Sequence, residues 1–130
     1  MSIEAAVRAM LTAGTTINLV PDDRVTHGYR LQDSVLPAIT YEVRSVETQT
    51  VGANPTRLAD VEVRCIADRG EDALAIAAQV RSASVAGSFG GFTFDAVIYE
   101  NHTLEAGIAG EGDESAPGEA VCTMKIHYRE

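Results

Sequence analysis

The stretch "RLADVEVRCIADRGEDALAIAAQV", residues 57–80, holds a strand pattern followed at once by a helix pattern. In its first half, apolar and polar residues alternate, which is the period of a strand with one buried face. We expect Asp68 to cap the following helix, with Glu71 three residues later as in a capping box. The helix has one apolar face, because apolar residues recur at helical spacing: Ala73, Ile76, Ala77 and Val80. The stretch therefore predicts a helix that packs on a sheet.

The same patterns recur on both sides of this stretch. We expect a first helix that Ser2 caps and Gly14 ends, with one apolar stripe: Ile3, Ala6, Val7, Met10 and Leu11. Alternation predicts further strands at 37–50, 92–105 and 120–130, and residues 25–31 fit a short edge strand. In the strand at 92–105 we expect one side to carry Phe92, Phe94, Ala96 and Ile98. The glycine-rich residues 86–91 are predicted to form a linker.

The length of the chain, 130 residues, fits one domain spanning 1–130. Since every strand is half polar, we predict an α+β fold. It has a mostly antiparallel four- to five-stranded sheet with two helices packed on one face. Two loops are expected to project from it. The loop near 49–57 joins two strands through Gly, Asn and Pro, and the loop near 106–119 is rich in glycine and acid.

The charge balance narrows the classes of partner. Ten basic and nineteen acidic residues give a formal charge of −9. Such a surface repels phosphate, so a groove that grips nucleic acid is not expected. The N-terminus lacks the pattern of a signal peptide, and no segment has the length of a membrane helix. We therefore expect a protein that is made and kept in the cytoplasm and has no membrane partner.

No candidate for bond-making chemistry stands out. Cys65, Cys122 and His127 lack the ligand spacing of a zinc site, and we expect two buried thiols. The run "GIAGEG" at 107–112 lies among acids that repel phosphate, and Asp113 with Glu114 lacks the calcium-loop pattern. We predict no enzyme activity, no cofactor and no metal. A small ligand-binding or enzymatic α+β domain, with a cavity between helix and sheet, stays open as an alternative.

Four blocks of the sequence resemble a known family when they are taken in order. They are "MSIEAAVRAMLTAG", "LPAITYEVRS", "DVEVRCIADRGEDALAIAAQVRSA" and "CTMKIHYRE". Together they cover about half of the chain, include both ends, and resemble the tail completion, or tail terminator, proteins of long-tailed bacteriophages and gene transfer agents. The chain departs from the family at Ile66-Ala67, where an aromatic residue is often found, and in a longer and more acidic loop before the last strand.

The resemblance implies a structural virion protein without catalytic residues. Such proteins form a ring, usually a homo-hexamer, on the head-proximal end of the tail tube. The ring stops tube polymerisation, binds the tube protein and the head connector or stopper protein, and lets DNA pass as non-specific cargo. The implied location is the virion, after assembly in the host cytoplasm. Another head–tail joining protein or a tail tube protein is the alternative within the same class.

Two sets of residues are candidates for these contacts. A closed ring of identical subunits needs head-to-tail contacts. Mixed charges on the outer sides of two neighbouring strands are the candidate ring contacts: Glu42, Arg44, Glu62 and Arg64. Loops on a rigid scaffold often carry binding. The two projecting loops therefore supply the candidate contacts to tube and connector: Gly52, Asn54, Arg57, Glu111, Asp113 and Glu114.

Overall fold

The computed structural model describes residues 2–28, 35–51, 54–106 and 118–130. Over these residues the chain forms two α-helices, one short 3₁₀ helix and six strands. In chain order the elements are α1 (Ile3–Thr12), η1 (Asp22–Arg24), β1 (Val25–His27), β2 (Ala38–Val51), β3 (Asn54–Ala67), α2 (Gly70–Ala83), β4 (Gly87–Phe89), β5 (Phe92–Ala106) and β6 (Gly118–Arg129).

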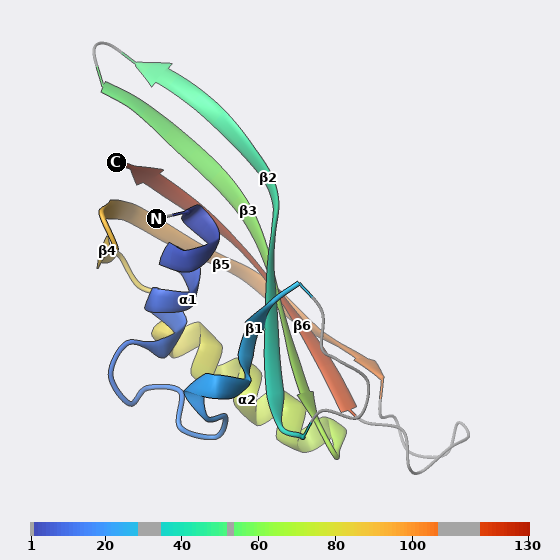
Figure 1. The fold of residues 1–130 in the computed structure, drawn as a ribbon. Coiled ribbons are helices and arrows are strands. Elements are labelled where there is room, and N and C mark those ends of the chain that lie inside the picture. The colour runs from blue at the N-terminus through green and yellow to red at the C-terminus, as the bar shows by residue number, and fades with distance from the viewer. Residues whose placement is uncertain (1, 29–34, 52–53, 107–117) are drawn as a thin grey trace.

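The six described strands form one curled sheet in the order β1-β2-β3-β6-β5-β4 (Figure 1). Only the β1–β2 pair is parallel, and the other neighbouring pairs are antiparallel. The α+β class is therefore confirmed, whereas the predicted number of four to five strands is too low. The strand that was missed is β4, which lies inside the presumed linker. Three residues are too few to show an alternating pattern in the sequence.

Both helices lie on the concave side of the sheet (Figure 1). Helix α1 packs against β1, β2 and β4, while α2 packs against β3, β5 and β6. The core lies between the helices and the sheet. Its largest fully buried side chains are Tyr128, Phe94, Met10, Leu11, Ile39, Ile76, Met124 and Ile126. The opposite, convex face of the sheet carries no helix among the described residues.

The two helices begin in different ways. Helix α1 has the predicted cap, because the Ser2 hydroxyl accepts a hydrogen bond from Ala5 N at 3.2 Å. The predicted cap of α2 is wrong, since Arg69 is the N-cap residue and no side chain caps the helix. A Cβ atom on Gly118 would collide with the backbone of Arg69 and Gly70. The start of α2 is thus held by close backbone packing on β6, which no capping pattern reports.

The predicted inner side of β5 is correct only as far as Phe94. The register with β6 shifts between Phe94 and Ala96, so the next residues change face. Val97 and Tyr99 pack against the core, and Ile98 is 49% exposed. The expectation that Ala96 and Ile98 continue the inner side is therefore wrong. An alternating sequence does not reveal a bulge, because the extra residue is defined by the partner strand.

The connection between β2 and β3 is much shorter than the predicted loop over 49–57. The ladder between the two strands continues to the pair Val51–Asn54. Threonine and valine favour an extended backbone, which explains why the strand continues past the residues read as a loop. Past Arg57, which pairs with Tyr128, the hairpin extends beyond the other strands (Figure 1). Of the other predicted loop, residues 107–117 lie outside the described residues.

Candidate functional site

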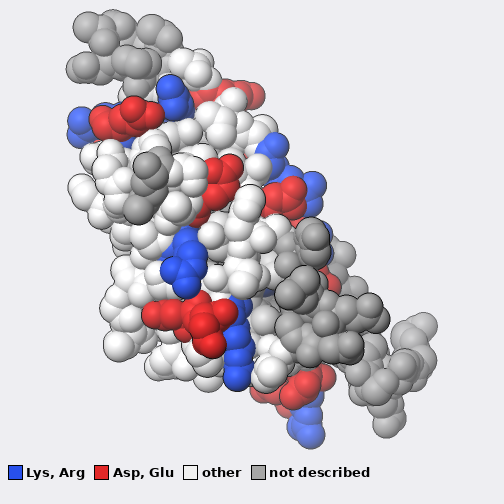
Figure 2. Space-filling model, in the orientation of Figure 1, with Lys and Arg blue, Asp and Glu red and all other residues white. Residues whose placement is uncertain are grey.

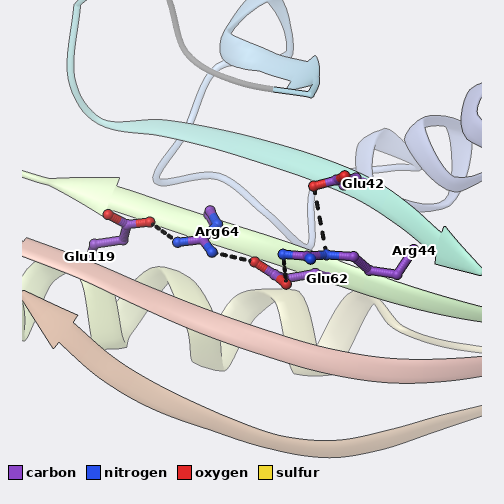
Figure 3. Close-up of polar contacts among 5 residues, drawn as sticks. All are labelled: Glu42, Arg44, Glu62, Arg64 and Glu119. Carbon is purple, nitrogen blue, oxygen red and sulfur yellow. Dashed lines mark hydrogen bonds and ion pairs between the residues drawn. The ribbon is translucent and has the colours of Figure 1, made fainter.

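The convex face of the sheet carries a chain of charged side chains that crosses three strands (Figure 3). Glu42 and Arg44 come from β2, Glu62 and Arg64 from β3, and Glu119 from β6. These positions face away from the helices because they alternate with the buried residues of the same strands. The structure thus brings the four predicted ring-contact residues together and adds Glu119.

Glu62 is the centre of this cluster. Its two carboxylate oxygens bind different partners, Arg44 Nη2 at 2.5 Å and Arg64 Nη2 at 2.6 Å. The contact with Arg64 is an ion pair, because the buried Oε1 atom of Glu62 lacks a hydrogen bond of good geometry. The side chain of Glu62 is only 12% exposed. Glu62 is therefore the least exposed member of the cluster and the one that contacts both arginines.

The ion pairs at the two ends of the cluster differ in length and exposure. Arg64 Nη1 donates a hydrogen bond of 2.5 Å to Glu119 Oε1, and this bond is the main cause that raises the pKa of Arg64. At the other end Arg44 Nε lies 3.7 Å from Glu42 Oε2, with both side chains about half exposed. Each arginine thus has a carboxylate partner within its own chain. The sequence missed Glu119, because it lies at the border of the acidic loop.

An open hollow of about 570 Å³ adjoins this cluster. It lies where β1 ends, beside His27 and Gly28, and is lined on β2 by Thr40, Glu42 and Val43. Its lining mixes charged and apolar side chains, as many surfaces that bind another protein do. Figure 2 shows acidic and basic side chains interspersed over the face in view, without a field of one sign. This pattern suits contact with a protein better than contact with a polyanion.

The predicted tube and connector contacts are only partly described. Arg57 is 43% exposed and lies 3.5 Å from Glu130 in a surface ion pair. Asn54 begins β3 and pairs with Val51. Gly52, Glu111, Asp113 and Glu114 lie outside the described residues. Their role as contacts stays a prediction.

The two cysteines are buried, free thiols on β3 and β6. The hydrogen bond between the thiols, together with burial, raises the pKa of Cys65 far above its ordinary value. Neither thiol has exposed surface, so both act as small apolar groups of the core. Within the described ranges, no group of three or more His, Cys, Asp or Glu side chains is arranged to hold a metal ion.

The histidines are dispersed over three strands. The ring of His27 on β1 lies tilted beside that of Tyr41, with the centroids 5.4 Å apart, and His102 Nδ1 lies 3.1 Å from the Tyr99 hydroxyl. His127 lies on β6 and faces away from the helices. The described helices include none with the length and apolar composition needed to cross a membrane.

Comparison with known proteins gives a match at the level of the fold. No protein-family model and no curated protein matches the sequence. Among solved structures, a chain of the virion of a native gene transfer agent particle superposes with a TM-score of 0.75. The match covers 99% of this chain and 96% of that chain, at 14% sequence identity. The chain therefore shares the complete fold of that virion chain.

Proposed function

We propose that this chain is a structural, non-enzymatic protein of a phage-type virion or gene transfer agent, and more narrowly its tail terminator. In this role it forms a ring, a homo-hexamer, on the head-proximal end of the tail tube. The ring stops polymerisation of the tube protein and binds the head connector or stopper protein. It is found in the virion after assembly in the host cytoplasm.

One observation carries this proposal. The fold matches a chain of a gene transfer agent virion from end to end, with 99% and 96% of the two chains aligned. A match restricted to a few strands and a helix is common among unrelated α+β domains, whereas a match over both complete chains includes the edge strands and the long hairpin. The sequence blocks that resemble tail terminators lie in α1, β2, β3 to α2, and β6, so they occupy the framework of the same fold.

The charge of the chain fits a channel for DNA as cargo. Each subunit has a formal charge of −9, and a ring multiplies it. A wall of that sign keeps DNA phosphates from adhering, so the DNA passes without being gripped. Arg44 and Arg64 on the convex face are held by carboxylates of the same chain, in the cluster around Glu62. DNA is therefore a non-specific cargo in this proposal and no sequence is read.

The long β2–β3 hairpin and the acidic loop are the proposed contacts to the tube and the connector. The hairpin extends past the end of β6, where it has no other strand beside it among the described residues. A two-stranded ribbon is marginally stable alone, so packing on a second protein would hold it. Deleting residues 52–55 should leave the subunit folded and impair the joining of heads and tails. Normal particles from this variant would discard the hairpin as a contact.

Electron microscopy of particles from cells that lack the gene tests the function. We expect tails of uncontrolled length, or tails detached from full heads, and restoration by the gene supplied in trans. Cells that make no tails at all would identify a tail tube protein instead. Normal particles of normal length would refute a role in the virion tail.

A further inference from the structure

The two edges of the sheet are each covered over only part of their length. On one edge, β1 pairs with β2 from Ile39 to Tyr41. On the other edge, β4 pairs with β5 from Phe92 to Phe94. Among the described residues, no strand pairs with the outer side of β2 after Tyr41 or of β5 after Phe94. Unpaired edges present backbone N–H and C=O groups that can pair with another chain.

The two short strands lie at different heights along the sheet. A row here means residues that pair with one another across neighbouring strands. One such row leads from β2 to β5 and contains Tyr41, Val63, Cys122 and His102. Thr48 is in one row with Gly87 of β4: Thr48, Arg57, Tyr128, Phe94 and Gly87. Strand β1 therefore covers one end of its edge, and β4 covers the opposite end of the other edge. Within the part of the chain that the structure describes, each edge therefore has a stretch without a neighbouring strand at the height where the other edge carries one.

The strand directions allow the two edges to pair with each other in neighbouring copies of the chain. Strand β1 runs parallel to β2. Four antiparallel steps lead from β2 through β3, β6 and β5 to β4, so β4 also runs in the direction of β2. A rotation about an axis along the strands preserves these directions. The β4 strand of a second copy would then continue the line of β1, in the same direction, along the free end of β2.

We propose that a second copy of this chain docks in this way, with its β4 pairing in parallel with β2 near Thr48. In the same contact β1 pairs in antiparallel orientation with the outer backbone edge of the second copy's β5, beyond the residues that pair with β4. The contact is head-to-tail, because the two edges differ, and its repetition closes a ring. This inference rests on the proposed ring and assigns its contact to the strand edges, in place of the charged cluster on the convex face.

The backbone groups of β2 point the right way for this pairing. The Tyr41 carbonyl accepts a hydrogen bond of 2.9 Å from Gly28 N, so the Tyr41 backbone faces away from β3. Thr48 has the same orientation as Tyr41. Their partners on β3, Arg57 and Val63, are an even number of residues apart in a regular ladder with β6, so the backbone groups of both partners point to the same side. The backbone N–H and C=O of Thr48 therefore point to the free edge.

Charge also favours the edges over the convex face. Subunits with a formal charge of −9 repel one another, so a contact forms most readily through uncharged segments. Strand β4 is Gly-Ser-Phe, and the free stretch 45–51 of β2 carries only Glu47 as a charged residue. The charged cluster is balanced within the chain, since Glu62 and Glu119 bind the arginines beside them. The cluster thus needs no neighbour, whereas the edge does.

Paired cysteines test the contact directly. Positions 49 and 88 each follow a member of the row of Thr48 and Gly87, on two strands that run in the same direction, so cysteines there would lie on the same face of the joined sheet. Within one chain the two positions are four strand spacings apart, roughly 19 Å, which no disulfide can span. We expect the double variant Gln49→Cys with Ser88→Cys to form a ladder of covalent multimers under oxidation. The matched control, Thr48→Cys with Ser88→Cys, places the thiols on opposite faces and should give little cross-linking.

A proline variant tests the same contact without a new bond. Thr48→Pro removes an N–H that faces the free edge and leaves the hydrogen bonds of the β2–β3 hairpin in place. Native mass spectrometry should show self-association for the wild type and for Thr48→Val, and loss of it for Thr48→Pro at an unchanged Tm. Monomers only, for the wild type at about 1 mM, would overturn the proposal. A covalent dimer formed by Gln49→Cys alone would also overturn it, because it indicates two-fold pairing.

The outcome is separable from that of the proposed function. Cross-linking and mass are measured on the purified chain, whereas the function is tested on particles from cells without the gene. A specific ladder combined with normal tails in those cells would refute the terminator role and keep the contact. Abnormal tails combined with an unchanged association of Thr48→Pro would refute the contact and keep the role.

Discussion

The two faces of β3 contrast within one strand. Its concave side carries Ala59, Val61, Val63 and Cys65, each at most 2% exposed, and packs against helix α2. Its convex side carries Glu62 and Arg64 in an ion cluster that joins three strands. The concave face determines the fold through burial, which is worth roughly 25 cal/mol per Å² of apolar surface. The convex face instead carries ion pairs between partly exposed side chains, which are worth less than buried apolar contacts, and no described helix covers it.

The largest expected effect on the free energy of unfolding comes from a substitution that creates a cavity on the concave side. Tyr128 is 2% exposed and packs edge-on against Phe92 and Phe94, with ring centroids 5.7 and 6.4 Å away. Tyr128→Ala should lower the free energy of unfolding by about 3–5 kcal/mol. Urea unfolding followed by circular dichroism measures this loss. A loss smaller than that of Glu62→Gln on the convex face would remove the contrast between the faces.

The second-largest effect on the free energy of unfolding is expected where the backbones of β6 and α2 are in close contact. Gly118→Ala introduces a Cβ atom that collides with the backbone at Arg69 and Gly70, so the helix must shift. We expect a loss of about 1–3 kcal/mol in the free energy of unfolding, as for overpacked cores. Gly14→Ala is a comparison variant without a collision, because a Cβ atom at Gly14 meets no neighbour within 4 Å and its cost comes from the φ of +63°. Equal stability of Gly118→Ala and wild type would contradict the close packing.

The convex face should respond more weakly and unevenly. Glu62→Gln leaves Arg44 and Arg64 without their shared carboxylate, and we expect a loss of about 1–2 kcal/mol. Glu42→Gln, in which the charge lost is half exposed and 3.7 Å from Arg44, should cost less than about 0.5 kcal/mol. The difference between the two variants in chemical denaturation sharpens the contrast. Equal effects would mean that the cluster has no centre.

The last expected effect is absent at neutral pH and consists of a dependence of the free energy of unfolding on alkaline pH. The pKa of Cys65 is raised by the hydrogen bond with Cys122 and by burial, so the folded chain retains a proton that the unfolded chain releases above about pH 8.5. The stability conferred is present below that pH and is lost as the pH rises. We expect one thiol to add a decline of up to about 1.4 kcal/mol per pH unit, and Cys65→Ala to lose this part of the slope. An identical slope in both proteins would place the titration elsewhere.

The framework of the fold was predictable because its signals are local. Alternation located the four long strands, and helical spacing with Ser2 located α1. The errors concern features that depend on a partner element. The bulge after Phe94 is defined by β6, the start of α2 by Gly118, and the short strand β4 by its pairing with β5. A single sequence carries no pattern for such relations.

The candidate site was predictable to a smaller degree. Glu42, Arg44, Glu62 and Arg64 were placed on one face from alternation alone, and the structure brings them together. Their mutual pairing was not expected, because two arginines and two glutamates on neighbouring strands allow several arrangements. Glu119 was missed because it lies at the border of the acidic loop, and its place in β6 is defined by its pairs with Ile66 and Ala106 on the neighbouring strands. The free edges follow from the strand order, which alternation does not determine.

Immunogold labelling of purified particles, with the chain carrying an epitope tag, tests the central claim most directly. A ring that terminates the tail should give a single cluster of gold on each tail, at the end that joins the head. Label spread along the whole tube, or absent from particles that contain full-length tails, would contradict a terminator.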